Sequence, residues 1–350
     1  MNDKPFILET IVRENIKKLK PYISARDEFK EFERDMVFLD ANENPFKTLW
    51  NRYPDPQQNK LKSQLAKIKN LNNNQILLGN GSDEVLDLIF RVFCDPNNDS
   101  VIVLPPTYGM YEVLAETNAV EVIKVPLSKE FQPQLENILG AVKPNTKLLL
   151  LCSPNNPTAN SFDFDLVEKL IKQFQGIVVI DEAYIDFSEE ESWCSKLSNY
   201  GNLIVTQTLS KAYGLAGIRL GMCFASPDII ALLNLIKPPY NINSLTQSKA
   251  LEALTESSNV KEQVAVLIRE RKTLSKGLIK LDFVQKIYPS QANFLLVKVD
   301  DALARYKQLV DSGIVVRNRS REVGCENCLR ITVGTPEENE MLLKTLKTLP

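Results

Sequence analysis

The stretch Leu203-Ile-Val-Thr-Gln-Thr-Leu-Ser-Lys211 is an apolar segment that changes abruptly to a serine and a lysine. Its β-branched and aliphatic residues predict a buried strand over 203–207. A second apolar segment, 177–180, stops in the same way at Asp181, and Tyr184 follows three residues later. The chain thus places an amine, a carboxylate and a phenol just after two buried strands.

Short apolar segments of this kind recur through the first two thirds of the chain. They cover residues 75–78, 101–104, 120–125, 148–152, 177–180, 203–207 and 221–225. Amphipathic segments of helical length, such as 165–174, separate several of them. Strands that are apolar throughout and joined by helices are typical of a parallel sheet covered on both faces. We therefore predict an α/β domain with a mostly parallel seven-stranded sheet covered by helices.

A different pattern begins near residue 244, where a long helical stretch starts. Further strands are predicted over 293–299, 314–317 and 328–333. A last helix is predicted to start at Thr335, with Pro336 at its first position and Glu338 placed for a capping box. This region predicts a smaller α+β domain. We expect an N-terminal arm over 1–30, a small domain over 31–45 and 244–350, and a large domain over 46–243.

Composition limits the partners and the chemistry of this 350-residue chain. Its 42 basic and 44 acidic residues are interspersed and give a net charge of −2. The sequence therefore has no basic cluster of the kind that binds nucleic acid or an anionic membrane. No apolar run reaches the ~20 residues of a membrane span, and the N-terminus has no long apolar core of a signal peptide. We expect a cytoplasmic protein whose partners are small molecules.

The chain contains no histidine, which excludes serine-histidine hydrolysis and histidine-ligated metal catalysis. The six cysteines are scattered, as is usual for reduced thiols. Cys325 and Cys328 have metal-like spacing, but a zinc site would need remote single cysteines to complete it. We expect no metal, and a lysine in place of histidine as the proton carrier.

A phosphate site is one interpretation of Gly79-Asn-Gly-Ser-Asp-Glu84, which follows a short strand and opens a helix with an apolar face. Its backbone amides and the helix dipole could hold an anion, although a tight turn before a helix needs no ligand. Arg219 lies between two glycines, eight residues after Lys211, and could pair with the same phosphate or lie on the surface.

Asp181, Tyr184 and Lys211 together suggest one cofactor. Taken alone, Asp181 could simply cap a helix. A lysine that forms an imine and a carboxylate that pairs with a cationic ring are, however, what a protein must supply to pyridoxal phosphate. The segment 153–158 and Tyr108 also follow predicted strands, where α/β sheets bind ligands. Without a ligand, 153–158 could be a simple turn and Tyr108 could pack in the core.

The order of these motifs resembles that of the fold-type-I pyridoxal-phosphate-dependent aminotransferases, and within them it is most similar to the histidinol-phosphate aminotransferase family. The resemblance covers nearly the whole chain. It is carried by Pro21-Tyr22, Arg52-Tyr-Pro54, Gly79-Asn-Gly-Ser-Asp-Glu84, Pro106-Thr-Tyr-Gly-Met-Tyr111, Ser153-Pro-Asn-Asn-Pro-Thr158, Asp181-Glu-Ala-Tyr184, Thr208-Leu-Ser-Lys211, Arg219 and Leu329-Arg-Ile-Thr-Val-Gly334. One departure is Ala159, where the family usually has glycine; alanine fits there unless φ must be positive.

The resemblance implies a role for each matching residue. Lys211 would form the Schiff base with the cofactor and move the proton between Cα and C4′, and Asp181 would pair with the pyridine nitrogen. Other cofactor contacts would come from Tyr184 and Asn156 to the ring hydroxylate, Tyr108 stacked on the ring, and Ser82, Asp83, Glu84, Thr208, Ser210, Arg219 and a partner subunit's Tyr53 around the phosphate. Substrate contacts would come from Tyr22, Asn156, Arg317 and Arg330.

The same resemblance implies a homodimer that uses pyridoxal 5'-phosphate to exchange the amino group between L-histidinol phosphate and 2-oxoglutarate or glutamate in histidine biosynthesis. An aromatic amino acid transaminase and a threonine-phosphate decarboxylase remain alternatives with similar motifs. A pyridoxal-phosphate-binding regulator is a non-enzyme alternative. Such regulators usually carry a DNA-binding module, and the sequence shows neither clustered basic charge nor a helix-turn-helix segment.

Overall fold

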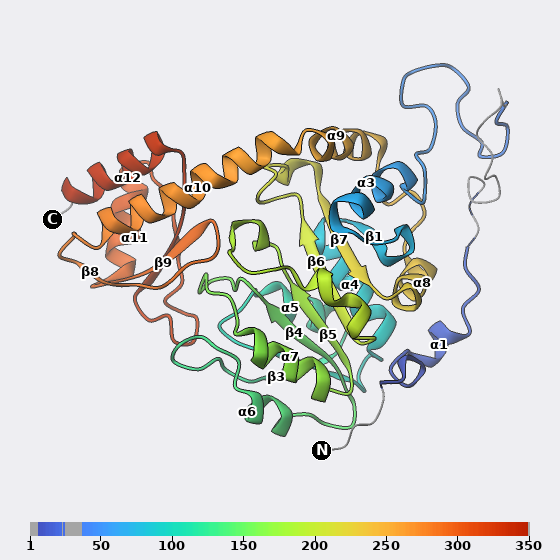
Figure 1. The fold of residues 1–350 in the computed structure, drawn as a ribbon, viewed down its shortest axis with the longest axis horizontal. Coiled ribbons are helices and arrows are strands. Elements are labelled where there is room, and N and C mark those ends of the chain that lie inside the picture. Colours follow the sequence, from blue (N-terminus) through green and yellow to red (C-terminus); the bar gives the residue numbers. More distant parts are fainter. Residues whose placement is uncertain (1–5, 23, 25–36, 349–350) are drawn as a thin grey trace.

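The computed structural model describes residues 6–22, 24 and 37–348, which form two sheets with helices around them (Figure 1). The strands of the large sheet are β1 (Ile76–Asn80), β2 (Ser100–Val103), β3 (Glu121–Lys124), β4 (Thr146–Cys152), β5 (Ile177–Asp181), β6 (Leu203–Thr208) and β7 (Leu220–Ala225). The strands of the second sheet are β8 (Val284–Ile287), β9 (Phe294–Val299), β10 (Arg317–Asn318) and β11 (Cys328–Thr332). The helices are α1 (Glu14–Lys17), α3 (Asn59–Lys69), α4 (Gly81–Phe93), α5 (Met110–Thr117), α6 (Leu135–Gly140), α7 (Phe164–Gln173), α8 (Pro227–Ile236), α9 (Ser244–Thr255), α10 (Ser257–Leu278), α11 (Ala302–Asp311) and α12 (Pro336–Thr348).

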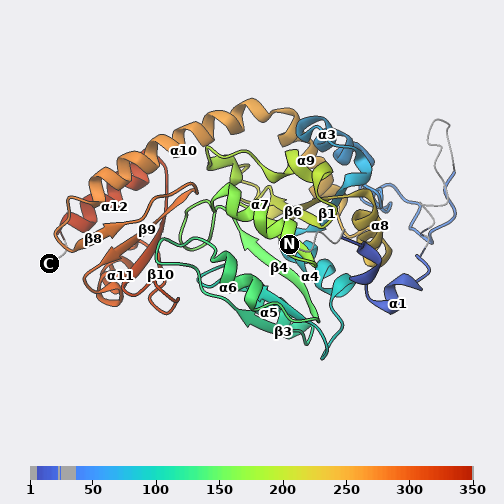
Figure 2. The same cartoon turned by 60° about the horizontal axis from the view of Figure 1, so that its bottom comes forward.

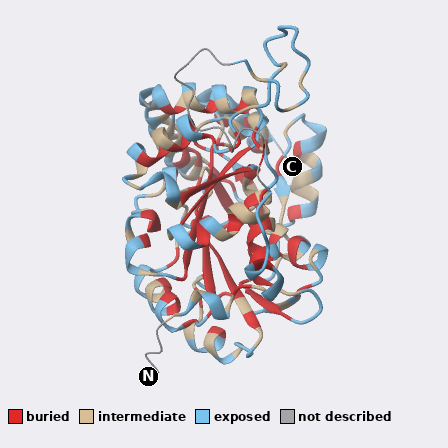
Figure 3. Ribbon diagram, turned by 90° about the vertical axis from the view of Figure 1, so that its right-hand side faces the viewer, coloured by how far each residue is buried: buried red, intermediate tan, exposed pale blue. Residues whose placement is uncertain are grey.

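The large sheet has the strand order β1-β7-β6-β5-β4-β2-β3. Its neighbours from β6 to β3 pair in parallel, and β7 runs antiparallel to both β1 and β6. Figure 3 shows these strands as the buried centre of the molecule. The predicted α/β domain with a mostly parallel seven-stranded sheet is confirmed.

Two apolar layers cover the faces of this sheet. Leu149 and Leu151 of β4 pack in one layer with α3, α6, α7 and α9, whereas Leu148 and Leu150 pack in the other with α4, α5 and α8. The alternation follows from the two-residue period of a strand, because successive side chains point to opposite faces. Both faces are therefore buried, which explains why the central strands are mostly apolar, whereas the edge strand β3 begins and ends with exposed charged residues.

The N-terminal segment joins the second of these layers. Val12 and Ile16 are buried there beside α4 and α8, and Arg13 Nε donates to Asp95 Oδ1 at 2.8 Å. The division of the chain into an arm, a small and a large domain stays a prediction. Parts of the expected arm (1–30) and of the expected small-domain segment (31–45) lie outside the described residues.

The second sheet has the order β10-β11-β9-β8 and is antiparallel throughout. The strand predicted over 314–317 is wrong in extent, since β10 includes just its last residue and Asn318. The sequence analysis did not identify β8, a short strand whose middle residues Gln285 and Lys286 are exposed. In Figures 1 and 2, α10 runs from α9 beside the large sheet to α12 beside the second one.

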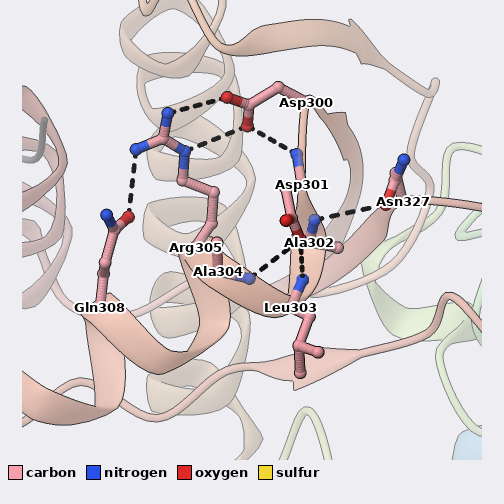
Figure 4. Close-up of polar contacts among 8 residues, drawn as sticks. All are labelled: Asp300, Asp301, Ala302, Leu303, Ala304, Arg305, Gln308 and Asn327. Carbon is pink, nitrogen blue, oxygen red and sulfur yellow. Dashed lines mark hydrogen bonds and ion pairs between the residues drawn. The ribbon is translucent and has the colours of Figure 1, made fainter.

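Local hydrogen bonds fix the helices of the second sheet. Thr335 and Glu338 form the predicted capping box of α12, with Thr335 N donating to Glu338 Oε2 at 2.8 Å and Glu338 N to Thr335 Oγ1 at 3.2 Å. Asp301 caps α11 by accepting from the amides of Leu303 and Ala304 (Figure 4).

The same cluster ties α11 to the turn before β11. Arg305 binds both carboxylate oxygens of Asp300 at 3.0 and 2.8 Å, and Ala302 N donates to Asn327 Oδ1 at 3.4 Å (Figure 4). Asn327 adopts a φ of 56°, which asparagine tolerates better than most residues. The start of β11 is thus tied to the N-terminus of α11.

One close approach brings β7 against the first turn of α4. A Cβ atom on Gly221 would lie 2.3 Å from the amide nitrogen of Ser82, so glycine is the side chain that lets the helix begin there. The N-terminus of α4 therefore lies directly beside the end of β6, which pairs with Gly221 through Thr208.

We expect Gly221→Ala to lower the free energy of unfolding by about 1–3 kcal/mol, because the added methyl group must push α4 away from β7. Urea unfolding followed by circular dichroism would measure this. Gly140→Ala is the matched control, since no atom lies within 4 Å of its added Cβ, and it should leave the midpoint unchanged or slightly raised. Equal effects of the two variants would contradict the close-packing argument.

Candidate active site

A cavity of about 330 Å³ lies where the parallel strands of the large sheet end, and the second sheet supplies its opposite wall. This is the edge at which open α/β sheets bind ligands. The residues that line it are Ser82, Asp83, Tyr108, Cys152, Asn156, Asp181, Ala183, Tyr184, Thr208, Ser210, Lys211, Ala216, Arg219, Arg317, Arg319 and Arg330. Most of the predicted site residues are therefore brought together in one pocket.

One end of the cavity has groups that favour negative charge. Ser82 and Asp83 lie in the first turn of α4, where free amides and the helix dipole favour negative charge. Gly81 has a φ of 79°, and a Cβ atom there would lie 2.5 Å from Arg219 Nη2. The absence of that side chain lets the guanidinium lie against the helix end.

Arg219 is held in place by its own backbone. It adopts a left-handed conformation with φ 55°, and its carbonyl accepts a hydrogen bond from Gly81 N at 3.0 Å. Its Nη2 lies 3.7 Å from Asp83 Oδ2, so the side chain is only loosely paired. At the end of β6, Thr208 Oγ1 accepts from Ser210 N at 3.1 Å and lies 3.0 Å from Ser210 Oγ. Two hydroxyls thus join the guanidinium at this end.

Asp181 provides a buried negative charge at the centre of the cavity. Its side chain accepts hydrogen bonds from Tyr111 Oη at 2.8 Å and from Ala183 N at 3.2 Å. Burial raises the pKa of this carboxyl group, and the bond from Tyr111 opposes that effect. None of the described residues forms a salt bridge with Asp181, so its charge has hydrogen bonds but no cation.

Lys211 follows β6 and extends over the face of Tyr184, with Nζ 5.6 Å from the ring centroid. Loss of hydration in the pocket lowers the pKa of this amine, the charge of Arg330 lowers it further, and Asp181 acts in the opposite direction. Burial likewise raises the pKa of the Tyr184 phenol. A larger fraction of Lys211 is therefore neutral, which is the form that attacks carbonyl carbons.

Arg330 joins the two sheets across the cavity. Its Nη1 donates to Asn156 Oδ1, from the turn after β4, and its guanidinium lies 5.3 Å from the centroid of the Phe294 ring. Arg317 pairs with Arg330 in the register of β10 and β11, so both arginines are presented from one hairpin. The positive wall thus faces the lysine and the buried carboxylate.

Three predicted site residues do not line this cavity. The Glu84 side chain accepts from Asn80 N and from Asn241 Nδ2, which closes the start of α4. Tyr53 stacks on Tyr240 with centroids 4.5 Å apart and lines a separate cavity, and Tyr22 is exposed. The contacts predicted for these residues, including the one from a partner subunit's Tyr53, stay predictions.

Sequence reasoning missed several residues of the site. Cys152 lines the cavity because β4 ends beside Asp181 in register, and Tyr111 reaches Asp181 from α5. Arg319 could have been found from its spacing, since it lies two residues after Arg317 in an extended stretch and so on the same side. Tyr111 belongs to the motif 106–111 that carries the resemblance, but its contact with Asp181 was not predicted, because a buried aromatic residue on a helix is ordinary core.

Ala159 shows where this chain departs from the expected turn. It is fully buried and has a φ of 68°, a conformation that disfavours residues with a Cβ atom. Its amide donates to Asn155 O at 2.7 Å, and its carbonyl accepts from Gln291 N at 2.7 Å. The positive φ that disfavours alanine is therefore present at this position. The two hydrogen bonds of Ala159 hold its backbone in that conformation.

Comparison with known proteins identifies relatives over the whole chain. The family model for aminotransferase class I and II matches residues 29–346. A curated histidinol-phosphate aminotransferase of Flavobacterium johnsoniae is 60% identical over 98% of this chain and 99% of its own length. The protein of the same name from Parabacteroides distasonis is 54% identical over 98% of this chain and 99% of its own.

Solved structures share the fold. The histidinol-phosphate aminotransferase from Clostridium acetobutylicum has a TM-score of 0.79 at 24% identity, over 85% of this chain and 90% of that one. The one from Sinorhizobium meliloti, in complex with pyridoxal-5'-phosphate, has a TM-score of 0.78 at 24% identity, over 85% and 84%. The predicted resemblance is confirmed: the chain belongs to the aminotransferase class I and II family, and within it to the histidinol-phosphate aminotransferases.

Proposed function

We propose that this protein exchanges the amino group between L-histidinol phosphate and 2-oxoglutarate or glutamate in histidine biosynthesis, with pyridoxal 5'-phosphate as cofactor. The observation that carries the proposal is a single cavity that contains a lysine, a buried carboxylate without a cation, and anion-binding groups at both ends. Relatives with 54–60% identity that bear this name support the choice of substrate.

The residues of the cavity fit the cofactor. The carboxylate of Asp181 lacks a cationic partner among the described residues, and a protonated ring nitrogen would provide one. The glycine-lined end of α4, the hydroxyls of Thr208 and Ser210, and Arg219 form a donor set suited to a phosphate group. Asn156 and Tyr184 would hold the ring oxygen, and Tyr108 the face of the ring.

When bound, pyridoxal phosphate supplies an aldehyde that takes up the amino group and a ring that accepts electrons from the bond being broken. Lys211 Nζ accepts the proton that leaves the substrate Cα and releases it again. This role suits an amine whose pKa is lowered, in a chain without histidine. Asp181 maintains negative charge at the centre of the site, and Tyr111 orients its carboxylate. Arg317 and Arg330 bind the anionic end of the substrate through their planar forks.

We further propose that the protein is a cytoplasmic homodimer. Apolar side chains along residues 37–50 and at Leu245 are strongly exposed, as is common at subunit interfaces. A partner subunit at this surface would cover them and bring Tyr53 near a second active site. Among the described helices, none is long and apolar enough to cross a bilayer. Light scattering that gives the mass of one chain would contradict the dimer.

The substrate is tested by comparing three reactions of the cofactor-loaded protein. We expect glutamate to form from 2-oxoglutarate fastest with L-histidinol phosphate and more slowly with L-phenylalanine. We expect no carbon dioxide from O-phospho-L-threonine. Release of carbon dioxide from O-phospho-L-threonine at a higher rate than amine transfer from L-histidinol phosphate would support a threonine-phosphate decarboxylase. Equal rates of amine transfer from L-phenylalanine and L-histidinol phosphate would support an aromatic amino acid transaminase.

Replacing Lys211 by alanine should abolish covalent attachment of the cofactor and lower the rate of amine transfer by at least about 10³-fold, because the chain loses its nucleophile and proton carrier. Borohydride reduction and mass spectrometry of the wild type should find the cofactor on the peptide that contains residue 211. Lys249→Ala, at an exposed lysine paired with Glu252, is the control and should behave as wild type. Cofactor fixed to another lysine would refute the assignment.

The buried charge of Asp181 should make the cofactor-free protein sensitive to pH. Because its pKa is raised, the folded state binds this proton at a higher pH than the unfolded chain does, so stability falls as pH rises through that window. Asp181→Asn should therefore be more stable than wild type at pH 8 and no more stable at low pH, since an amide can still bond to Tyr111 and Ala183.

Thermal unfolding of the cofactor-free proteins from pH 4.5 to pH 8 measures this difference. The same variant should lose about 10²- to 10³-fold in activity, because the charge that acts on the ring is gone. It should also gain less stability than wild type when the cofactor is added. A variant that is less stable than wild type at pH 8 would contradict the idea that the buried carboxylate destabilises the cofactor-free protein.

A further inference from the structure

Three arginines of the second sheet face the cavity, and the expected family pattern accounts for two of them. Arg317 and Arg330 pair across β10 and β11, and Arg319 follows one residue after β10. Arg319 N donates to Cys328 O at 2.8 Å, which continues the ladder by one step. Its side chain lines the same cavity as the other two. The backbone therefore presents Arg319 to the site as firmly as it presents Arg317.

The guanidinium of Arg319 is poorly satisfied by the protein itself. Its side chain is 28% exposed, and its Nε is buried without a hydrogen-bond partner among the described residues. Its contact with Glu322 is at the limit of a hydrogen bond, with Nη1 3.5 Å from Oε1. An arginine that lines a cavity and has only this weak ion pair is suited to bind an oxygen-rich anion.

The positive charges at this wall repel one another. Burial lowers the pKa of Arg330, and the charge of Arg319 lowers it further, ahead of the charge of Arg317. Arg319 is thus the stronger of the two cations acting on Arg330. A ligand with two negative charges relieves this repulsion more than a ligand with one. A phosphate monoester carries close to two charges above pH 7, whereas a carboxylate carries one.

We infer that Arg319 is a substrate-binding residue that, with Arg317 and Arg330, selects substrates carrying a phosphate group over the same amines without one. The inference rests on the proposed function and adds to it a residue that sets specificity. Arg319 binds the phosphate oxygens and takes no part in proton transfer. Its loss therefore weakens binding of the phosphorylated substrate and leaves the chemical step intact.

The test compares L-histidinol phosphate with L-histidinol in the cofactor-loaded protein at pH 8. Arg319→Gln should raise the KM for histidinol phosphate about 10- to 100-fold, the range for a hydrogen bond between charged groups, with kcat nearly unchanged. The kcat/KM for histidinol, which lacks the phosphate, should stay within about twofold because Arg319 makes no contact it needs. Arg319→Lys, which keeps the charge but loses the fork, should recover part of the affinity.

Arg321→Gln is the matched control, because Arg321 is an exposed arginine of the same loop that does not line the cavity. It makes the same change of charge and should leave both substrates unaffected. The inference is overturned if Arg319→Gln binds histidinol phosphate as wild type does, if it weakens both substrates equally, or if Arg321→Gln has the same effect. A wild type that does not use histidinol phosphate refutes the proposed function, and this inference with it.

Discussion

The hydrogen bond from Tyr111 to Asp181 holds a negative charge at a place where the fold alone would not keep one. Asp181 ends a strand that is buried on both faces, and its pKa is raised by that burial. The hydroxyl of Tyr111 and the amide of Ala183 satisfy its oxygens without neutralising it. A buried carboxylate of this kind lowers the stability of the protein unless a cation pairs with it.

The other groups of the site are arranged around this charge by the parallel sheet. Strands β4, β5 and β6 end at one edge, so Cys152 pairs with Asp181 and Asp181 with Thr206, although they are far apart in the chain. Thr208 follows at the end of β6 and lines the same cavity. The turns that follow add Asn156, Tyr184 and Lys211. The antiparallel strand β7 then returns the chain and places Arg219 beside the start of α4, where Gly221 lets the two backbones meet.

The second sheet closes the cavity with positive charge. Arg330 contacts Asn156 from the large sheet, and the hairpin of β10 and β11 fixes Arg317 and Arg319 beside it. The turn before β11 is held by Asn327 and the cap of α11, so the arginines start from a fixed backbone (Figure 4). Of the arginines at this wall, Arg330 lowers the pKa of Lys211.

The sequence by itself determined the strands of the large sheet and the capping box at Thr335, because apolar segments and cap residues are local signals. Most of the residues that line the cavity were expected from the resemblance to the aminotransferase family, which rests on the order of the motifs along the chain. It did not determine the length of β10 or the existence of β8, since short edge strands with exposed residues lack a clear apolar pattern. The tertiary structure alone decided that Tyr111 reaches Asp181 from another element and that Ala159 adopts a positive φ. These features depend on which elements lie side by side, and a sequence pattern with a period of two or four residues carries no information about that.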